Sequence, residues 1–164
     1  NPAAIAVCYL RDNAWYIVDE WKLAERTTAE IIQVIKNKMT EHLVSQIFPD
    51  PAEPDRIEEC RRAGLPIMEA NKDIKGGISQ IQQLIREKRF FITENCKEII
   101  DEASMYHYPE PQEGKEEKDE PEKFNDHLMD AMRYAIYSYE PISRKVVISS
   151  EAIKPYYGDA EIAF

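Results

Sequence analysis

Two strand-length segments separated by a turn sequence open the chain and restrict the folds that it can adopt. Residues 2–10 form a nearly continuous apolar run, which is typical of a strand buried on both faces in the middle of a sheet. Arg11, Asp12 and Asn13 favour a turn, and residues 14–23 continue with strand-like alternation. The pattern predicts a β-hairpin whose first strand lies in the core.

Helical and strand-like segments alternate through the rest of the chain. The spacing of apolar residues predicts helices over 27–43, 55–63, 78–88, 95–106 and 124–139, and short apolar runs predict strands over 47–48, 66–70 and 90–93. Thr27 and Glu30 form a capping-box pattern at the start of the first helix. The strand, helix and strand between residues 47 and 70 indicate a crossover with parallel pairing. The expected fold class is α/β, with a mixed sheet flanked by helices.

Two polar segments flank the last predicted helix. Residues 109–123 contain no apolar side chain and three prolines, which predicts a mobile acidic surface loop that either lies idle or covers a site. Residues 141–164 begin with a helix-breaking proline and read as a C-terminal tail, with strand propensity over 144–149. We therefore expect one domain over residues 1–140, followed by the tail.

Composition limits the classes of protein that remain. With 164 residues, 43% of them hydrophobic and 32% charged, the chain has the composition of one soluble globular domain, and no apolar run reaches the ~20 residues that a membrane span needs. The three cysteines are far apart and form no C-x-x-C pair, so we expect reduced thiols in the core. The net charge of −10 works against autonomous nucleic-acid binding and suits carboxylates that hold divalent cations.

The helix predicted over 124–139 begins with acidic side chains. In a helix, Asp126, His127 and Asp130 share one face and form a group that can bind a metal, while an apolar stripe on the opposite side packs on the core. The alternative is that Asn125 or Asp126 only caps the helix and His127 is a surface residue. Asp130 lies farther into the helix, where a capping role explains it less well.

Asp50 is the second acidic candidate, because it directly follows the predicted strand 47–48 in a proline-rich loop. Ligand-binding residues collect at the C-terminal ends of strands in open α/β sheets. Carboxylates that converge from separate elements repel one another unless a cation joins them, and an all-oxygen site favours Mg²⁺ or Mn²⁺. Two such ions about 4 Å apart catalyse phosphodiester hydrolysis and need three or four acidic ligands.

A loop over 71–77 adds weaker candidates. Lys72 either lies along the core edge with its amine in solvent or faces a phosphate near the site. Gly76 and Gly77, before the helix predicted over 78–88, are either part of a plain loop or let backbone amides approach a phosphate.

Four short motifs resemble the C-terminal nuclease domain of the large terminase subunit of tailed bacteriophages. They are N-P-A-A-I-A at residues 1–6, D-P-A-x-P at 50–54, E-A-N-K at 69–72 leading to Gly77, and D-x₃-D-A-x-R-Y at 126–134. The last is the most specific. The resemblance implies a ribonuclease H-like fold and a metal-dependent DNA endonuclease that cuts concatemeric DNA during genome packaging.

Carried over residue by residue, the resemblance implies that Asp50 and Asp130 are catalytic metal ligands, with Asp126 as a further ligand and His127 and Lys72 in supporting roles. Its first catalytic aspartate stands on the opening strand just before the residues that match Asn1 and Pro2. We therefore expect this chain to begin within a truncated strand and to lack one acidic ligand. The implied cofactor is Mg²⁺ or Mn²⁺, at two positions.

The resemblance also implies partners and a setting. These are double-stranded DNA, a portal protein, a small terminase subunit and an ATPase motor domain upstream, in the cytoplasm of the host cell and away from membranes. A second hypothesis is a docking or assembly module of the same packaging machine that cuts nothing. A third is another nuclease of the same fold, such as a junction resolvase.

Overall fold

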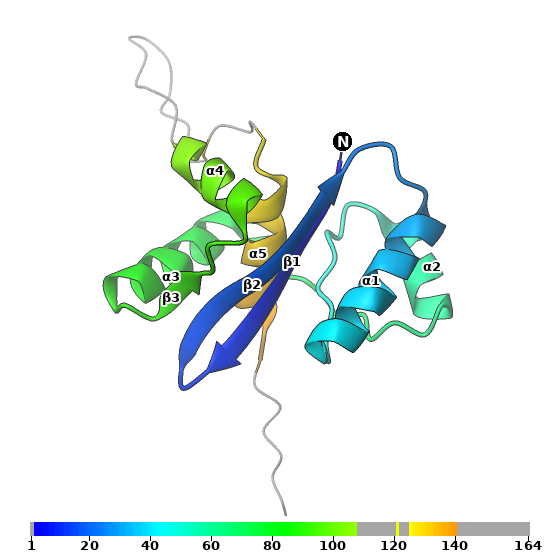
Figure 1. Cartoon of the computed structure of the whole chain (residues 1–164), viewed down its shortest axis with the longest axis horizontal. Coiled ribbons are helices and arrows are strands. Elements are labelled where there is room, and N and C mark those ends of the chain that lie inside the picture. The colour runs from blue at the N-terminus through cyan, green and yellow to red at the C-terminus, as the bar shows by residue number, and fades with distance from the viewer. Residues whose placement is uncertain (1, 108–120, 122–124, 141–164) are drawn as a thin grey trace, which may run out of the picture.

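The computed structural model describes residues 2–107, 121 and 125–140. The segment predicted as a loop over 109–123, apart from residue 121, and the tail over 141–164 lie outside the described residues. The elements in chain order are β1 (Ala3–Arg11), β2 (Ala14–Leu23), α1 (Thr28–His42), α2 (Pro54–Arg62), α3 (Ile74–Arg86), β3 (Phe90–Ile92), α4 (Lys97–Met105) and α5 (His127–Ser138) (Figure 1). The predicted α/β class is confirmed.

The sheet of the described residues has the order β1-β2-β3. β1 and β2 form the predicted antiparallel hairpin, with Arg11 opposite Ala14 and a register shift between Val7 and Cys8. β3 pairs in parallel with the other side of β2. The expectation that the first strand is central is therefore wrong for the described residues: β2 is central, and β1 has one unpaired edge.

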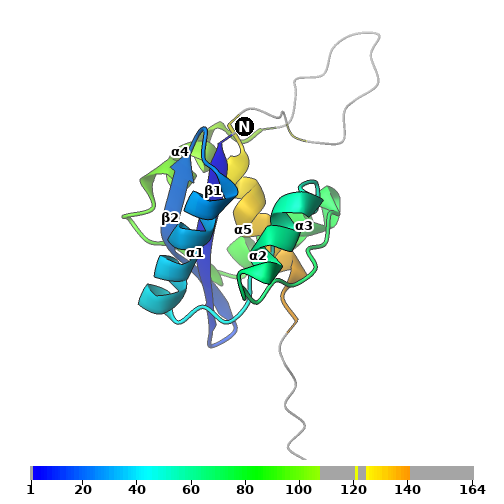
Figure 2. The ribbon, with the colours of Figure 1, turned by 90° about the vertical axis from the view of Figure 1, so that its right-hand side faces the viewer.

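Helices lie on both sides of the hairpin (Figures 1 and 2). α3, α4 and α5 lie on one side, and α1 and α2 lie on the other. The core forms where β2, α3, α4 and α5 meet, and its buried residues are Trp15, Ile17, Ile81, Leu84, Cys96, Ile99, Leu128, Met132 and Ile136. α5 also packs along β1, so this helix is held between the sheet and α3.

The segments predicted as strands over 47–48 and 66–70 form only one parallel bridge, between Ile47 and Ile67. The Ile47 amide donates to the Pro66 carbonyl at 3.0 Å, and the Met68 amide donates to the Ile47 carbonyl at 2.8 Å. The predicted parallel pairing is confirmed. The ladder stays short because Pro49 and Pro66 have no amide hydrogen to donate.

Most helix boundaries agree with the sequence pattern. α1 has the predicted capping box, in which the Thr27 hydroxyl accepts from the Glu30 amide and the Glu30 carboxylate accepts from the Thr27 amide. α2 is followed by Gly64 at φ +80°, a conformation in which glycine avoids the strain of a side chain.

Helix α3 begins at Ile74 rather than at residue 78, so Gly76 and Gly77 lie in its first turn. The reason is Asp73, whose carboxylate accepts a hydrogen bond from the Gly76 amide at 3.1 Å and caps the helix. The prediction of a plain loop that extends through these glycines is therefore wrong. The alternative of a phosphate cradle also loses its basis, because the Asp73 carboxylate already occupies the end of the helix.

Two helices differ from prediction in the face that they bury. The apolar spacing of the helices predicted over 78–88 and 95–106 places Ile85, Ile100 and Ala103 on their inward faces. In the structure Ile85 is 55% and Ile100 41% exposed, and Ala103 is also exposed. On α4 the inward position belongs instead to Glu102, which is only 2% exposed. A periodicity argument places a charged residue outside, so it could not anticipate this arrangement.

The three cysteines are free, as predicted. Cys60 and Cys96 are buried and Cys8 is partly buried. None of the helices in the described part of the chain has the length and apolar character needed to cross a bilayer.

Candidate functional site

The start of α5 is fixed by a carboxylate from another helix. Glu102 of α4 accepts hydrogen bonds from the backbone amides of Leu128 and Met129 at 2.8 and 3.0 Å. Its other oxygen accepts from Lys22 at 2.8 Å, so the buried charge is paired. Glu102 thereby takes the role that the sequence assigned to a local cap.

Asp126 occupies the N-cap position of α5 but makes no capping hydrogen bond through its side chain. The alternative in which Asp126 caps the helix through its carboxylate is therefore wrong. Asn125 instead accepts a hydrogen bond from Lys22 at 3.3 Å, which ties the approach to the helix to β2. The Asp126 carboxylate is left for another role.

Asp130 lies in the first turn of α5 and is held from within the same helix. The guanidinium of Arg133 donates from Nη2 to Asp130 Oδ1 at 2.8 Å. The Arg133 side chain is 3% exposed and that of Asp130 is 38% exposed, so a buried cation holds a carboxylate that reaches solvent. Burial alone would lower the pKa of Arg133, but the bond to Asp130 raises it overall.

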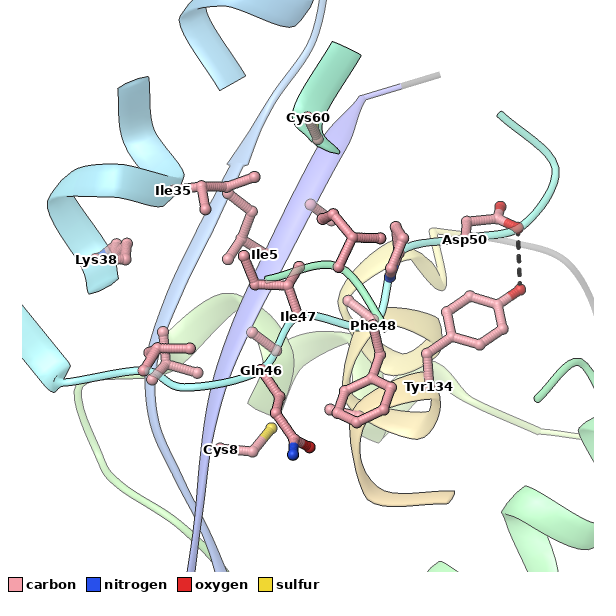
Figure 3. A pocket seen from close by; sticks show the side chains of 18 of the residues that line it. Ile5, Cys8, Ile35, Lys38, Gln46, Ile47, Phe48, Asp50, Cys60 and Tyr134 are labelled. Atoms are coloured by element: carbon pink, nitrogen blue, oxygen red, sulfur yellow. Dashed lines mark hydrogen bonds between the residues drawn. The ribbon is translucent and has the colours of Figure 1, made fainter. Parts of the chain in front are cut away.

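Asp50 lies in the loop that follows the bridge at Ile47, and its side chain bonds to the backbone of the same loop. Its Oδ1 accepts a hydrogen bond from the Ala52 amide at 2.9 Å, and the Tyr134 hydroxyl of α5 donates to the same oxygen at 3.4 Å (Figure 3). Burial raises the pKa of Tyr134, and the charges of Asp50 and Asp130 raise it further. Tyr134 therefore contacts Asp50 directly and lines the same pocket as Asp130.

The predicted site residues line two neighbouring pockets. A pocket of about 280 Å³ is lined by Asp50, Lys72, Asp126, Asp130, Arg133 and Tyr134, among others. A larger pocket of about 520 Å³, between β1, α1, α2 and α5, is bordered by His127 and shares Asp50, Asp130 and Tyr134 with the first. Four of the five residues selected from the sequence therefore line the smaller pocket, together with Arg133 and Tyr134, and His127 lines only the larger one.

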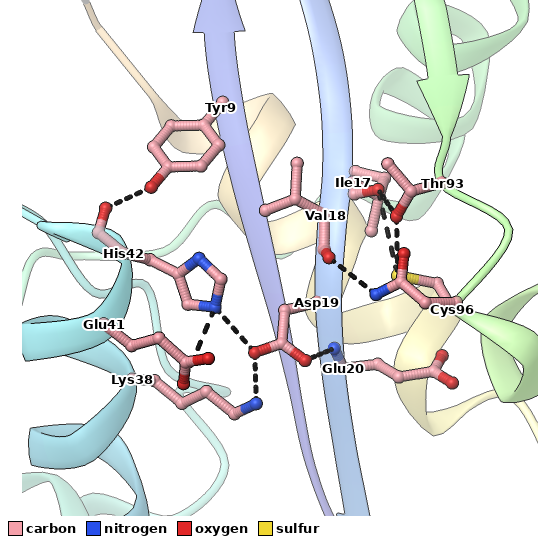
Figure 4. Close-up of polar contacts among 11 residues, drawn as sticks. Tyr9, Ile17, Val18, Asp19, Glu20, Lys38, Glu41, His42, Thr93 and Cys96 are labelled. Atoms are coloured by element: carbon pink, nitrogen blue, oxygen red, sulfur yellow. Dashed lines mark hydrogen bonds and ion pairs between the residues drawn. The ribbon is translucent and has the colours of Figure 1, made fainter.

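A second group of potential metal-binding side chains in the described part of the chain lies between β2 and α1, outside both pockets' acidic residues. Asp19, Glu41 and His42 place one ligand atom each within 4.8 Å of one another (Figure 4). However, Asp19 Oδ2 also pairs with the ammonium of Lys38 and lies 2.7 Å from His42 Nε2. A lysine already supplies the counter-charge there, and the cluster serves to join α1 to β2.

Sequence reasoning missed the supporting residues for two different reasons. Arg133 and Tyr134 belong to the D-x₃-D-A-x-R-Y motif, but their positions just after the acidic turn indicate, from sequence alone, only that they pack on or bridge neighbouring elements. Glu102 sits among other acidic residues of α4, so no local pattern distinguishes it. Its role depends on Lys22 and on the amides of α5, which are distant in the sequence.

Comparison with known proteins identifies the class. A family model described as the terminase RNase H-like domain matches residues 1–138, and the chain belongs to this family. It is 30% identical over 144 residues to the large terminase subunit of Escherichia phage T5, a match that covers 83% of this chain and 32% of that protein. The chain therefore spans about a third of this relative's length.

Solved structures agree with this class. The large terminase of a thermophilic bacteriophage matches with a TM-score of 0.74 and 27% identity, over 84% of this chain and 36% of that chain. The nuclease domain of the bacteriophage SPP1 large terminase, solved with bound Mn, matches in fold with a TM-score of 0.70 and 19% identity, over 84% of this chain and 79% of that chain. The resemblance of this chain to the nuclease domain of a large terminase subunit is confirmed.

Proposed function

We propose that this chain is the metal-dependent DNA endonuclease domain of a viral packaging terminase, with Asp50 and Asp130 as catalytic metal ligands. The observation that carries the proposal is that these two carboxylates, far apart in the sequence, line the same pocket, in which Tyr134 contacts Asp50. Asp126 is the further ligand, because its side chain makes no capping bond and borders the same space.

The donor set fits Mg²⁺ or Mn²⁺, since the candidate ligands are carboxylate oxygens. When bound, a pair of such ions activates a water and stabilises the leaving oxygen of a phosphodiester. The chain's own residues orient the carboxylates. The hydrogen bonds that Asp50 and Asp130 accept from Ala52, Tyr134 and Arg133 all go to Oδ1, so we propose that the Oδ2 atoms bind the cation. Lys72 is exposed and lines the same pocket, which supports its proposed contact with a phosphate.

A third carboxylate is expected from an extended segment in the larger pocket. This groove is lined by the consecutive residues 2–10 along β1 and by the consecutive residues 43–50 opposite (Figure 3). Ile47 uses both its amide and its carbonyl on residues 66–68, so its neighbours Gln46 and Phe48 direct their backbone groups the other way. A strand between β1 and residues 46–48 would complete the sheet and end beside Asp50 and Asp130.

The resemblance led us to expect a first catalytic aspartate on the opening strand itself, just before Asn1, whereas the groove favours a separate strand beside β1. We infer that residues upstream of this chain in the natural protein form that strand. The cutting of concatemeric DNA, the portal and small-subunit partners, the upstream ATPase domain and the host cytoplasm belong to the same proposal. The net charge of −10 implies that other parts of the protein help to hold the DNA.

Nicking of plasmid DNA tests the proposal. The protein extended upstream to include the strand is incubated with supercoiled plasmid and Mn²⁺, and Asp50→Asn or Asp130→Asn is expected to abolish nicking. Asp55→Asn is the matched control, because Asp55 is an exposed carboxylate on α2 outside both pockets. Undiminished nicking by Asp50→Asn or Asp130→Asn would remove the role assigned to that residue.

The second candidate function is a docking module that does not cut DNA, and the net charge of −10 is the observation that favours it. It predicts that the extended protein neither nicks plasmid nor binds Mn²⁺ in calorimetry, yet still binds the portal protein. Mn²⁺ binding that disappears in Asp130→Asn argues against this candidate.

A further inference from the structure

Arg133 is the least expected side chain of the candidate site, because it carries a charge yet is 2% exposed. Its aliphatic stem lies against Gly77 of α3. A Cβ at Gly77 would stand 2.7 Å from Cγ and 2.9 Å from Cδ of Arg133, which is too close for any side chain. The absence of a side chain at Gly77 therefore sets the path of the arginine across α3.

The guanidinium is poorly satisfied by hydrogen bonds. Nη2 donates to Asp130, while Nε and Nη1 are buried and have no hydrogen-bond partner among the described residues. Unpaired buried donors destabilise a fold. An apolar side chain of similar length would fill the same space without this penalty, so packing does not explain the arginine. What the guanidinium supplies, and an apolar side chain would not, is the bond to Asp130 and a cation against the Tyr134 ring.

Arg133 also contacts the neighbour of the second carboxylate. Its guanidinium carbon lies 4.7 Å from the centre of the Tyr134 ring, and the Tyr134 hydroxyl donates to Asp50. One fixed guanidinium thus touches Asp130 directly and packs on the residue that touches Asp50. Partners of this kind, one step removed from a metal, orient its ligands.

We propose that Arg133 is a positioning residue that orients the Asp130 carboxylate for cation binding by occupying Oδ1 and presenting Oδ2. This inference rests on the proposed function, because it needs Asp130 to be a metal ligand. Arg133 acts through Asp130 and makes no contact with the cation itself. Its contribution is geometric, because a positive charge near a cation by itself opposes binding of that cation.

The test separates geometry from charge in the full-length protein that carries this domain. Mn²⁺ affinity is measured by electron paramagnetic resonance, and the site is defined as the binding lost in Asp130→Asn. Arg133→Lys keeps the charge but replaces the planar guanidinium, which packs on the Tyr134 ring, with a compact ammonium on a flexible stem. It is expected to weaken this binding 10- to 100-fold, the usual effect of removing a partner that orients a metal ligand. Arg86→Lys, the same change at an exposed position of α3, is expected to leave the affinity unchanged.

Thermal unfolding accompanies each titration, so that loss of structure is not mistaken for loss of positioning. If Arg133→Lys does not fold, Gly77→Ala replaces it, because the added methyl displaces the arginine stem and leaves every charge in place; its Mn²⁺ affinity is also expected to fall. Unchanged affinity in the folded variant overturns the inference while leaving the proposed function intact. Absence of any Asp130-dependent Mn²⁺ binding in the unsubstituted protein overturns both.

Discussion

The side chain of Glu102 and the backbone of Leu128 are joined by a hydrogen bond of 2.8 Å that connects α4 to the first turn of α5. A helix usually receives such a cap from a residue beside its own N-terminus. Here the cap is a buried carboxylate from another helix, paired with Lys22. The position of the acidic face of α5 therefore depends on contacts among β2, α4 and α5.

Glu102→Ala is expected to lower the free energy of unfolding by about 3 kcal/mol, because it leaves two helix amides and the Lys22 ammonium without their buried acceptor. Glu102→Gln keeps a side-chain oxygen and is expected to cost less. Urea unfolding followed by circular dichroism measures both. Asp101→Ala, an exposed neighbour, serves as the control; an equal loss in Asp101→Ala and Glu102→Ala would contradict the assigned role.

Asp19 predicts a pH dependence of stability. Burial alone would raise the pKa of Asp19, but hydrogen bonds from Lys38, His42 and the Glu20 amide lower it overall. A carboxyl group with a lowered pKa in the folded state stabilises the protein above its ordinary pKa of about 4, and this contribution is lost as the pH falls through the folded-state value.

Asp19→Asn is therefore expected to cost about 2 kcal/mol at pH 7, and the difference from the unsubstituted protein is expected to shrink as the pH falls from about 5 to about 3. Urea unfolding at a series of pH values measures this difference. Asp101→Asn at an exposed position is the control. A difference that stays constant across this acid range would show that the Asp19 contacts do not supply the stability.

The thiols are expected to be unreactive in the folded protein. Burial raises the pKa of Cys8 to about 12, with a smaller contribution from Cys96, and burial also raises the pKa of Cys60 and Cys96. At pH 8 almost none of the Cys8 side chains are then thiolates, the reactive form. A thiol-disulfide reagent should label no cysteine in buffer and all three in denaturant. Rapid labelling of Cys8 in the native protein would contradict this prediction.

The capping box of α1 offers a local test. Thr27→Ala removes the hydroxyl that accepts from the Glu30 amide and is expected to lower stability by about 1 kcal/mol. Thr28→Ala, one position farther on and inside the helix, is expected to change little or to stabilise slightly, because alanine is the better helix former. Equal losses at the two positions would mean that the cap contributes nothing.

Local patterns predicted the hairpin, α1 and α2 to within about one residue at most ends, because capping residues, turn residues and apolar spacing act within a few positions of themselves. They failed where the decisive partner is distant. The apolar run of β1 indicates burial but does not say which strand lies beside it. α3 begins earlier than predicted because Asp73 caps it. From local sequence alone, the two adjacent glycines of its first turn instead favour a loop at these positions.

The candidate site shows the same contrast between residues that local patterns select and residues whose partners are distant in the sequence. A strand-end rule selected Asp50, helix geometry selected Asp126 and Asp130, and the resemblance joined them; the structure places all three at one pocket. Glu102 and Arg133 could not be selected in this way. Each is a buried charge, and a buried charge is stable only through partners that the tertiary fold supplies. Metal binding by the three carboxylates stays the central prediction.

The edge of β1 that is unpaired among the described residues bears on how the isolated chain behaves in concentrated solution. Such an edge presents free backbone donors and acceptors, which recruit extended segments of other molecules and begin aggregation. The surplus of negative charge opposes this process by mutual repulsion between molecules. Salt screens that repulsion, so the isolated chain should self-associate more readily at high ionic strength than at low.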